Sequence, residues 1–135
     1  MKNEAKKQPA TQESRQEFRV IVAGSRHFND YDKLKRHLDV ILANKLLVAG
    51  VTIISGCARG ADTLGERYAS ERHLPVLKFP ANWSKFGKSA GHKRNLQMAD
   101  NADAVVAFLA PDSRGTAHMI SVAKQRNLLL RVIDI

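Results

Sequence analysis

Short apolar runs alternate with amphipathic segments along most of this chain, and this alternation limits the folds that it can adopt. The runs are of strand length and rich in β-branched residues, whereas the segments between them place apolar residues at helical spacing. Strands are predicted at 18–23, 51–54, 75–79, 104–109 and 128–133, and helices at 34–42, 61–72, 92–101 and 115–126. Helices between consecutive strands require right-handed crossovers and parallel strands. The prediction is an α/β fold: a single Rossmann-like three-layer domain with a mostly parallel five-stranded sheet.

The length of 135 residues is that of one domain. Residues 1–17 are polar and almost free of large apolar side chains, so we predict a disordered tail there and a folded domain over 18–135. No apolar run approaches the roughly 20 residues of a membrane helix, and no secretory signal is visible. The single cysteine, Cys57, excludes an internal disulfide. We therefore expect a cytoplasmic protein without a membrane partner.

The net charge of the chain is strongly positive. There are 22 Lys and Arg residues against 13 Asp and Glu, which gives +9 at pH 7. Such a balance favours anionic partners, either nucleic acid or a phosphorylated small molecule. A basic surface that only keeps the protein soluble explains the charge equally well, because the basic residues are spread along the chain.

Small residues and a basic side chain occur together after four of the predicted strands, where an open parallel sheet binds its ligands. Glycine and serine let backbone amides approach an anion, helix N-termini add their positive dipole ends, and arginine offers a fork that matches phosphate. The pattern of residues 55–62 and 113–116 is the most specific, and we expect these two turns to face one crevice. The candidate ligand-binding residues are Gly24, Ser25, Arg26, Ser55, Gly56, Arg59, Gly60, Asp62, Arg94, Asn95, Ser113, Arg114, Gly115 and Thr116.

Several of these residues also have a plain structural interpretation. Gly24 alone is explained by a tight turn, and Asp62 by capping of the following helix. Cys57 has no activating base at a recognisable spacing, and Trp83 is equally suited to stacking on a base or to filling a long loop. Neither a GxGxxG nor a GxxxxGK[ST] motif is present, and the histidines show no metal-ligand spacing, so we expect no cofactor and no metal site.

Five short motifs in this order resemble the YspA/cpYpsA-related group of the SLOG superfamily. They are VAGSR at 22–26, SGCARGAD at 55–62, FPANW at 79–83, GHKRN at 91–95 and SRGT at 113–116. The resemblance covers 18–135 and implies a minimal Rossmann-type domain that binds nucleotides or nucleotide-derived ligands. It also implies self-association into a homo-oligomer.

Two better-understood relatives of that group imply different functions. LOG-type phosphoribohydrolases have an arginine that Arg94 matches and a Gly-Thr helix start that Gly115 and Thr116 match, but their following glutamate is replaced by 117–119, Ala-His-Met. Hydrolysis of an N-glycosidic bond would then rest on Arg94, with His118 as acid or base. The DNA-processing protein A family has a loop similar to 55–62 and binds single-stranded DNA, which suits the charge.

The leading hypothesis is a domain that binds a nucleotide or a nucleotide sugar, as a sensor or as an N-glycosidic hydrolase. Arginines 26, 59, 94 and 114 would bind phosphate, and the small residues would shape the cradle. The alternatives are a module that binds single-stranded nucleic acid and a structural domain with a vestigial pocket. The low aromatic content, 6%, argues against the first alternative, since single-strand binders use stacking platforms.

Overall fold

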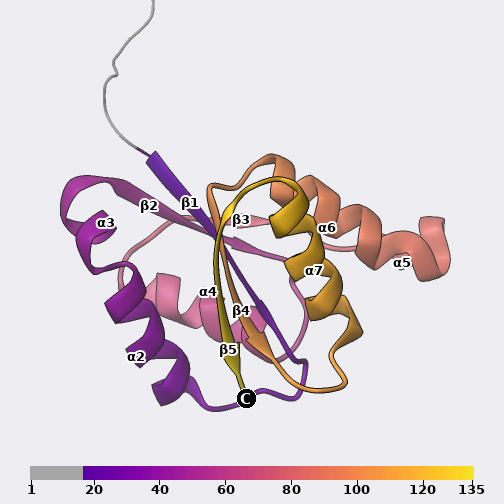
Figure 1. Cartoon of the computed structure of the whole chain (residues 1–135), viewed down its shortest axis with the longest axis horizontal. Helices are drawn as coiled ribbons and strands as arrows, with labels where there is room; N and C mark the ends of the chain where they lie inside the picture. The colour runs from indigo at the N-terminus through magenta and orange to yellow at the C-terminus, as the bar shows by residue number, and fades with distance from the viewer. Residues whose placement is uncertain (1–16) are drawn as a thin grey trace, which may run out of the picture.

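The structure is a computed structural model that describes residues 17–135, so the predicted tail lies outside the described residues except for Glu17. Strands and helices alternate along the chain as the sequence predicts (Figure 1). The strands are β1 (Glu17–Gly24), β2 (Gly50–Ser55), β3 (Val76–Lys78), β4 (Ala104–Leu109) and β5 (Leu129–Asp134). The helices are α2 (Tyr31–Ile41), α3 (Ala43–Val48), α4 (Ala61–Glu71), α5 (Trp83–Phe86), the 3-10 turn η2 (Gly87–Ser89), α6 (Ala90–Asp100) and α7 (Arg114–Gln125).

The five strands form one sheet in the order β3-β2-β1-β4-β5, and every neighbouring pair is parallel. The α/β fold class is therefore confirmed, and the sheet is parallel throughout. The chain moves outward from β1 to β3 on one side and from β4 to β5 on the other. The order thus reverses between β1 and β4, and in open α/β sheets the crevice at such a reversal is where ligands bind.

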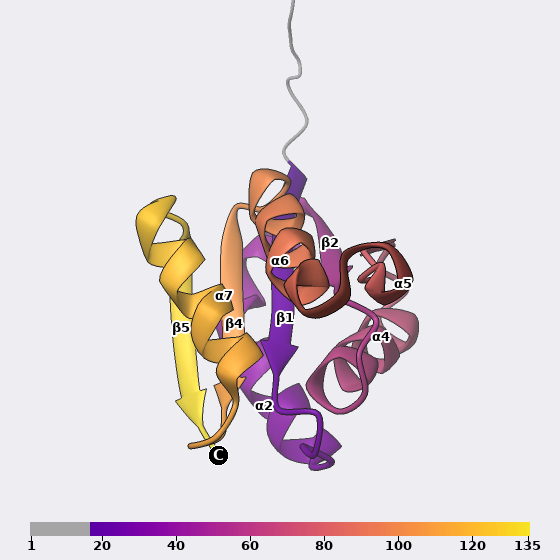
Figure 2. The ribbon, with the colours of Figure 1, turned by 90° about the vertical axis from the view of Figure 1, so that its right-hand side faces the viewer.

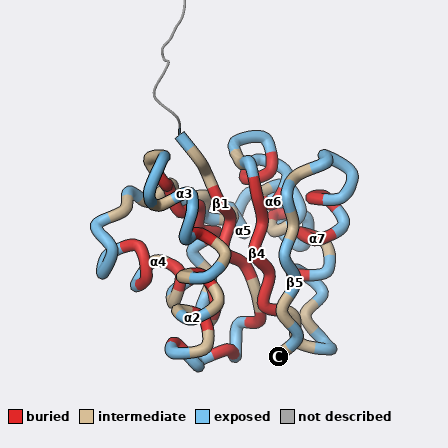
Figure 3. Tube along the Cα trace, turned by 60° about the vertical axis from the view of Figure 1, so that its left-hand side comes forward, coloured by how far each residue is buried: buried red, intermediate tan, exposed pale blue. Residues whose placement is uncertain are grey.

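Helices cover both faces of the sheet, so the domain has three layers with the sheet in the middle (Figure 2). On one face, α2 and α4 pack against alternate residues of β1 such as Val20 and Val22; on the other, α6 and α7 pack against Ile21 and Ala23. This alternation follows from the two-residue period of a strand. β2 and β4 are the most buried strands, β1 is buried in its second half, and β5 at the side of the sheet is largely exposed (Figure 3).

The element boundaries agree closely with the sequence pattern, with two differences. Asp30 caps α2 as expected, since its carboxylate accepts a hydrogen bond of 3.0 Å from the Lys33 amide. The segment 80–91, predicted as a loop, instead contains α5 and η2, and Asn82 caps α5 by accepting from the Lys85 amide. Helix α3 was also not predicted, because its six residues are too short to show a clear period. No helix among the described residues is both long and apolar enough to cross a membrane.

Candidate functional site

A cleft of about 780 Å³ lies at the carboxyl edge of the sheet, over the reversal of strand order. Its walls come from the loops after β1, β2 and β4 and from the segment that leads into α6. The two turns that the sequence singled out, 55–62 and 113–116, both contribute to it. Its lining includes Gly24, Ser25, Arg26, His27, Gly56, Cys57, Ala58, Arg59, Asp62, Trp83, Lys88, His92, Arg94, Asn95, Asp112, Ser113, Arg114, Gly115 and Thr116.

Backbone hydrogen bonds hold the loops of the cleft together. The Ser25 amide donates to the Phe108 carbonyl over 3.1 Å, and the Ser25 carbonyl accepts from the Ala61 amide over 3.2 Å. Gly60 makes the second contact possible, because it has a φ of +75° and a Cβ there would lie 2.2 Å from the Ser25 carbonyl oxygen. The end of β1 is therefore joined directly to β4 and to the start of α4, and the position of each loop depends on the others.

The rim of the cleft is basic. Arg26, Arg59 and Arg114 are exposed and come from the loops after β1, β2 and β4 respectively. Lys88 adds a fourth cation from η2. Because α4 and α7 begin at this edge, the positive ends of their helix dipoles also lie there. The rim thus combines exposed cations with fixed partial positive charge, which suits a phosphate or carboxylate group.

The floor of the cleft is polar but buried. Ser25, Asp62, Asn95 and Thr116 line it, and each is at most 6% exposed. Asn95 is the most connected of them: its amide nitrogen donates to the Gly115 carbonyl over 3.3 Å, and its oxygen accepts from Arg94 Nε over 3.0 Å. Buried polar groups cost free energy unless they are hydrogen-bonded, so four of them around one cleft mark a surface suited to a polar ligand.

Asp62 is the buried carboxyl group of the floor. Burial raises its pKa to about 6, although the Ala58 amide and the Arg94 guanidinium both favour the charged form. Its Oδ2 atom accepts a hydrogen bond of 3.1 Å from the Ala58 amide, which lies in the loop before α4. The interpretation of Asp62 as a cap of α4 is therefore wrong, since the cap residue is Gly60 and no side chain bonds the helix amides.

Arg94 reaches from α6 to the loop after β2 and closes one side of the cleft. Its Nη1 donates to the Gly56 carbonyl. A Cβ on Gly56 would lie 2.5 Å from that nitrogen and 2.9 Å from Asp62 Oδ2. Glycine is thus the residue that fits between the guanidinium and the carboxylate, and it keeps the two charged groups close.

Three of the predicted site residues do not line the cleft. Ser55 bonds within the fold, donating to Glu66 Oε2 over 2.6 Å and accepting from the Cys57 amide. Gly60 packs against the loop after β1, as described above. His118 lies behind Asn95, with its Nδ1 3.0 Å from the Asn95 amide nitrogen, and burial together with His92 lowers its pKa. Arg94 and His118, predicted to act together in hydrolysis, are therefore separated by Asn95, and hydrolysis stays a prediction.

Other residues of the site gain a clearer role from the structure. Trp83 lines the cleft with 58% of its surface exposed, and its ring lies against Gly91. Cys57 is exposed, but burial of the thiol and the Glu66 carboxylate raise its pKa, which is unfavourable for a nucleophile. Glu66 was missed by the sequence analysis, because it lies inside a helix and nothing in its spacing shows that it binds Ser55 and Lys78.

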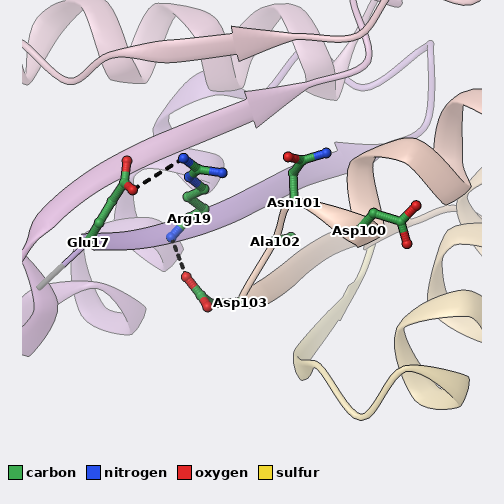
Figure 4. Close-up of a pocket in the computed structure, with 6 residues that line it drawn as sticks. All are labelled: Glu17, Arg19, Asp100, Asn101, Ala102 and Asp103. Carbon is green, nitrogen blue, oxygen red and sulfur yellow. Dashed lines mark hydrogen bonds and ion pairs between the residues drawn. The ribbon is translucent and has the colours of Figure 1, made fainter. Parts of the chain in front are cut away.

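A second pocket, of about 300 Å³, lies at the opposite edge of the sheet (Figure 4). Three of its six residues are acidic, and two of them contact Arg19: its guanidinium pairs with Glu17 at 3.3 Å. The backbone amide of Arg19 donates to Asp103 Oδ2 over 2.8 Å. This pocket is unsuited to an anion. Within residues 17–135, no group of three or more His, Cys, Asp or Glu side chains could hold a metal ion.

A parallel sheet of this strand order, with glycine-bearing turns around a cleft at the reversal, defines a Rossmann-like α/β domain. The chain belongs to the YspA, cpYpsA-related SLOG family, whose sequence model matches residues 18–86. It is also similar to the Gene 61 protein of Mycobacterium phage D29. The two are 32% identical over 118 residues, which cover 82% of this chain and 91% of the phage protein.

Solved structures share the fold at low sequence identity. DNA processing protein A from Streptococcus pneumoniae matches 87% of this chain with a TM-score of 0.66 at 14% identity, and this chain spans 50% of it. The protein TM1055 matches 85% of this chain and 72% of its own length, with a TM-score of 0.59 at 19% identity. DNA processing protein A from Helicobacter pylori, described with a single-stranded DNA binding mode, has a TM-score of 0.60 at 18% identity. It aligns over 85% of this chain and 64% of its own.

Proposed function

We propose that the cleft binds the phosphate group of a nucleotide or of a nucleotide-derived molecule such as a nucleotide sugar. The observation that carries this proposal is the convergence of three arginine-bearing loops on one cleft of about 780 Å³. Arg26, Arg59 and Arg114 offer guanidinium forks that match phosphate oxygens, and the first turns of α4 and α7 add amides. The volume falls within the roughly 300–1,000 Å³ of small-molecule sites.

Thermal unfolding in the presence of nucleotides tests this proposal. A ligand at a hundredfold excess over its Kd adds about 2.7 kcal/mol, so we expect the best of the four nucleoside 5′-monophosphates to raise the Tm by about 5–10 °C. Adenosine serves as the matched ligand without phosphate and should give a much smaller shift than AMP. An equal shift with adenosine would show that phosphate is not what the cleft recognises. The absence of a shift with all four monophosphates would end the proposal.

Binding of single-stranded nucleic acid is the second candidate, and the aromatic residues of α5 favour it. Trp83 and Phe86 are 58% and 38% exposed, and Lys93 Nζ lies 5.0 Å from the Phe86 ring centroid. The composition is poor in aromatics, but two of the few lie exposed on α5, with Trp83 bordering the basic cleft. Stacking platforms beside cations are the features that single-strand binders combine.

A filter-binding titration with a deoxyoligonucleotide separates this candidate from mononucleotide binding. If the surface binds a strand, Trp83→Ala should weaken it about five- to 150-fold through the loss of one stacked base, and affinity should fall steeply with salt. Leu47→Ala on α3 is the control, because Leu47 is also exposed but does not line the cleft. Equal losses in the two variants, or affinity that does not change with salt, would count against a nucleic-acid partner.

A further inference from the structure

Positive and negative charges occupy different parts of the cleft. The arginines of the rim are exposed, whereas the four buried residues of the floor include one carboxyl group, Asp62, with the half-buried Arg94 as its neighbouring cation. Two carboxyl groups line the cleft among the described residues: Asp62 in the floor and the exposed Asp112 near the rim. A phosphate is attracted to the rim and repelled from Asp62. We therefore expect the group of the ligand that contacts Asp62 itself to be uncharged and able to donate a hydrogen bond.

Asp62 retains capacity to accept such hydrogen bonds. With a pKa of about 6, it is mainly ionised at pH 7. An ionised carboxylate offers about four acceptor sites, and the backbone amides of Ala58 and Gly56 use two of them at most. Unlike the rim arginines, Asp62 is 6% exposed, so bonds to it form in a site that water enters poorly. A neutral hydroxyl group on the ligand is the donor that this carboxylate is placed to bind.

We propose that Asp62 accepts hydrogen bonds from the sugar hydroxyls of the ligand and so makes the cleft selective for ribonucleotides over their deoxy counterparts. This inference rests on the proposed nucleotide-binding function and assigns one residue to sugar recognition. It divides the ligand among three parts of the cleft: phosphate at the arginine rim, sugar on the polar floor, and base toward the exposed ring of Trp83. Asn95 and Thr116 supply further polar surface beside Asp62.

Isothermal titration calorimetry with AMP, 2′-deoxy-AMP and 3′-deoxy-AMP tests the assignment. Hydrogen bonds to charged groups are strong, so we expect at least one deoxy ligand to bind about tenfold more weakly than AMP. Asp62→Asn keeps an acceptor for the Ala58 amide but removes the charge, and it should reduce this ratio toward one. Asp112→Asn is the matched control, since it removes the other carboxylate of the cleft and should leave the ratio unchanged. The Tm of each variant verifies that it is folded.

The dependence of the same ratio on pH gives an independent readout. The charged and titratable groups around Asp62 are Arg94 from α6, Glu66 on its own helix, Cys57 and Arg59 in the preceding loop, and Arg26 after β1; His27, Lys88 and His92 border the same cleft. Protonation of Asp62 removes its charge and makes it a much weaker acceptor, so the preference for AMP should be full near pH 7.5 and decline as the pH falls through about 6. Titration of the phosphate group does not change this ratio of Kd values, because AMP and the deoxy ligands carry the same phosphate.

The outcomes separate this inference from the proposed function. If no monophosphate binds, the nucleotide site itself is rejected. If AMP and both deoxy ligands bind equally well, the cleft is a nucleotide site and the role of Asp62 is overturned. A ratio that persists in Asp62→Asn, or that rises at low pH, would also overturn it, because each result shows that the ionised carboxylate does not recognise the sugar.

Discussion

Replacing Gly60 by alanine is expected to destabilise the domain by about 3 kcal/mol or more, a large fraction of the stability of a domain this size. Two effects add. The backbone of Gly60 has φ +75° and ψ −127°, a region that residues with a Cβ rarely occupy. The new methyl group would also lie 2.2 Å from the Ser25 carbonyl oxygen and 2.6 Å from the Arg26 carbonyl carbon. Both contacts are with backbone, so no side chain can rotate away to relieve them.

Urea unfolding monitored by circular dichroism measures this effect. Gly115→Ala is the matched control: Gly115 lines the same cleft and lies in the first turn of α7, but its added Cβ would meet no atom within 4 Å apart from its chain neighbours and its own helix backbone. Alanine in a helix is favoured over glycine by roughly 0.5–1 kcal/mol, so this variant should be unchanged or slightly more stable. If Gly60→Ala unfolds at the same urea concentration as the parent, the tight contact between the loops after β1 and β2 is refuted.

Removing both Arg59 and Arg114 is expected to weaken AMP binding about 100-fold or more. Each charge-assisted hydrogen bond to phosphate contributes roughly 1.5–3 kcal/mol, and the two arginines reach the cleft from opposite sides of β1. Both side chains are exposed, so the double alanine variant should fold normally and keep its Tm in the absence of ligand.

The measurement is calorimetric titration of AMP into the Arg59→Ala, Arg114→Ala protein at a fixed, low ionic strength. Arg36→Ala controls for net charge, because Arg36 is an exposed arginine of α2 that does not line the cleft. The control should bind AMP with nearly the parental Kd. If each charge removed weakens AMP binding by the same factor in the double variant and in the control, the effect is a general electrostatic one. The two arginines would then not belong to the phosphate site.

The fold could be predicted well from the sequence because continuous apolar runs of strand length alternate with segments that place apolar residues at helical spacing. The buried strands have continuous apolar runs, and β4 occurs at the predicted residues, 104–109. The edge strand β3 is less well marked, since it has only three residues and none is fully buried. The short helices α3 and α5 were missed because a helix of one or two turns contains too few residues to show a period.

The position of the cleft and most of its lining residues were predicted, but the side-chain contacts within it were not. Topology alone brings the loops after β1, β2 and β4 to one edge, so most of the candidate residues do line it. Which of them are free to meet a ligand depends on side-chain contacts that spacing does not encode. Ser55 is engaged by Glu66, eleven residues away, and His118 stands behind Asn95. The role of Asp62 changed for the same reason, because its partner amide belongs to the loop and not to the helix.

The uniform direction of the strands has a practical consequence for attaching other molecules to this protein. The chain enters the sheet at the start of β1 and leaves it at the end of β5, so the two ends of the described fold lie at opposite edges (Figure 1). The Ile135 amide donates to the carbonyl of Leu109, the residue from which the Arg114 loop departs. A dye or fusion partner joined after Ile135 would emerge beside the cleft and report on ligand entry or obstruct it. One joined before Glu17 would be held at the far edge.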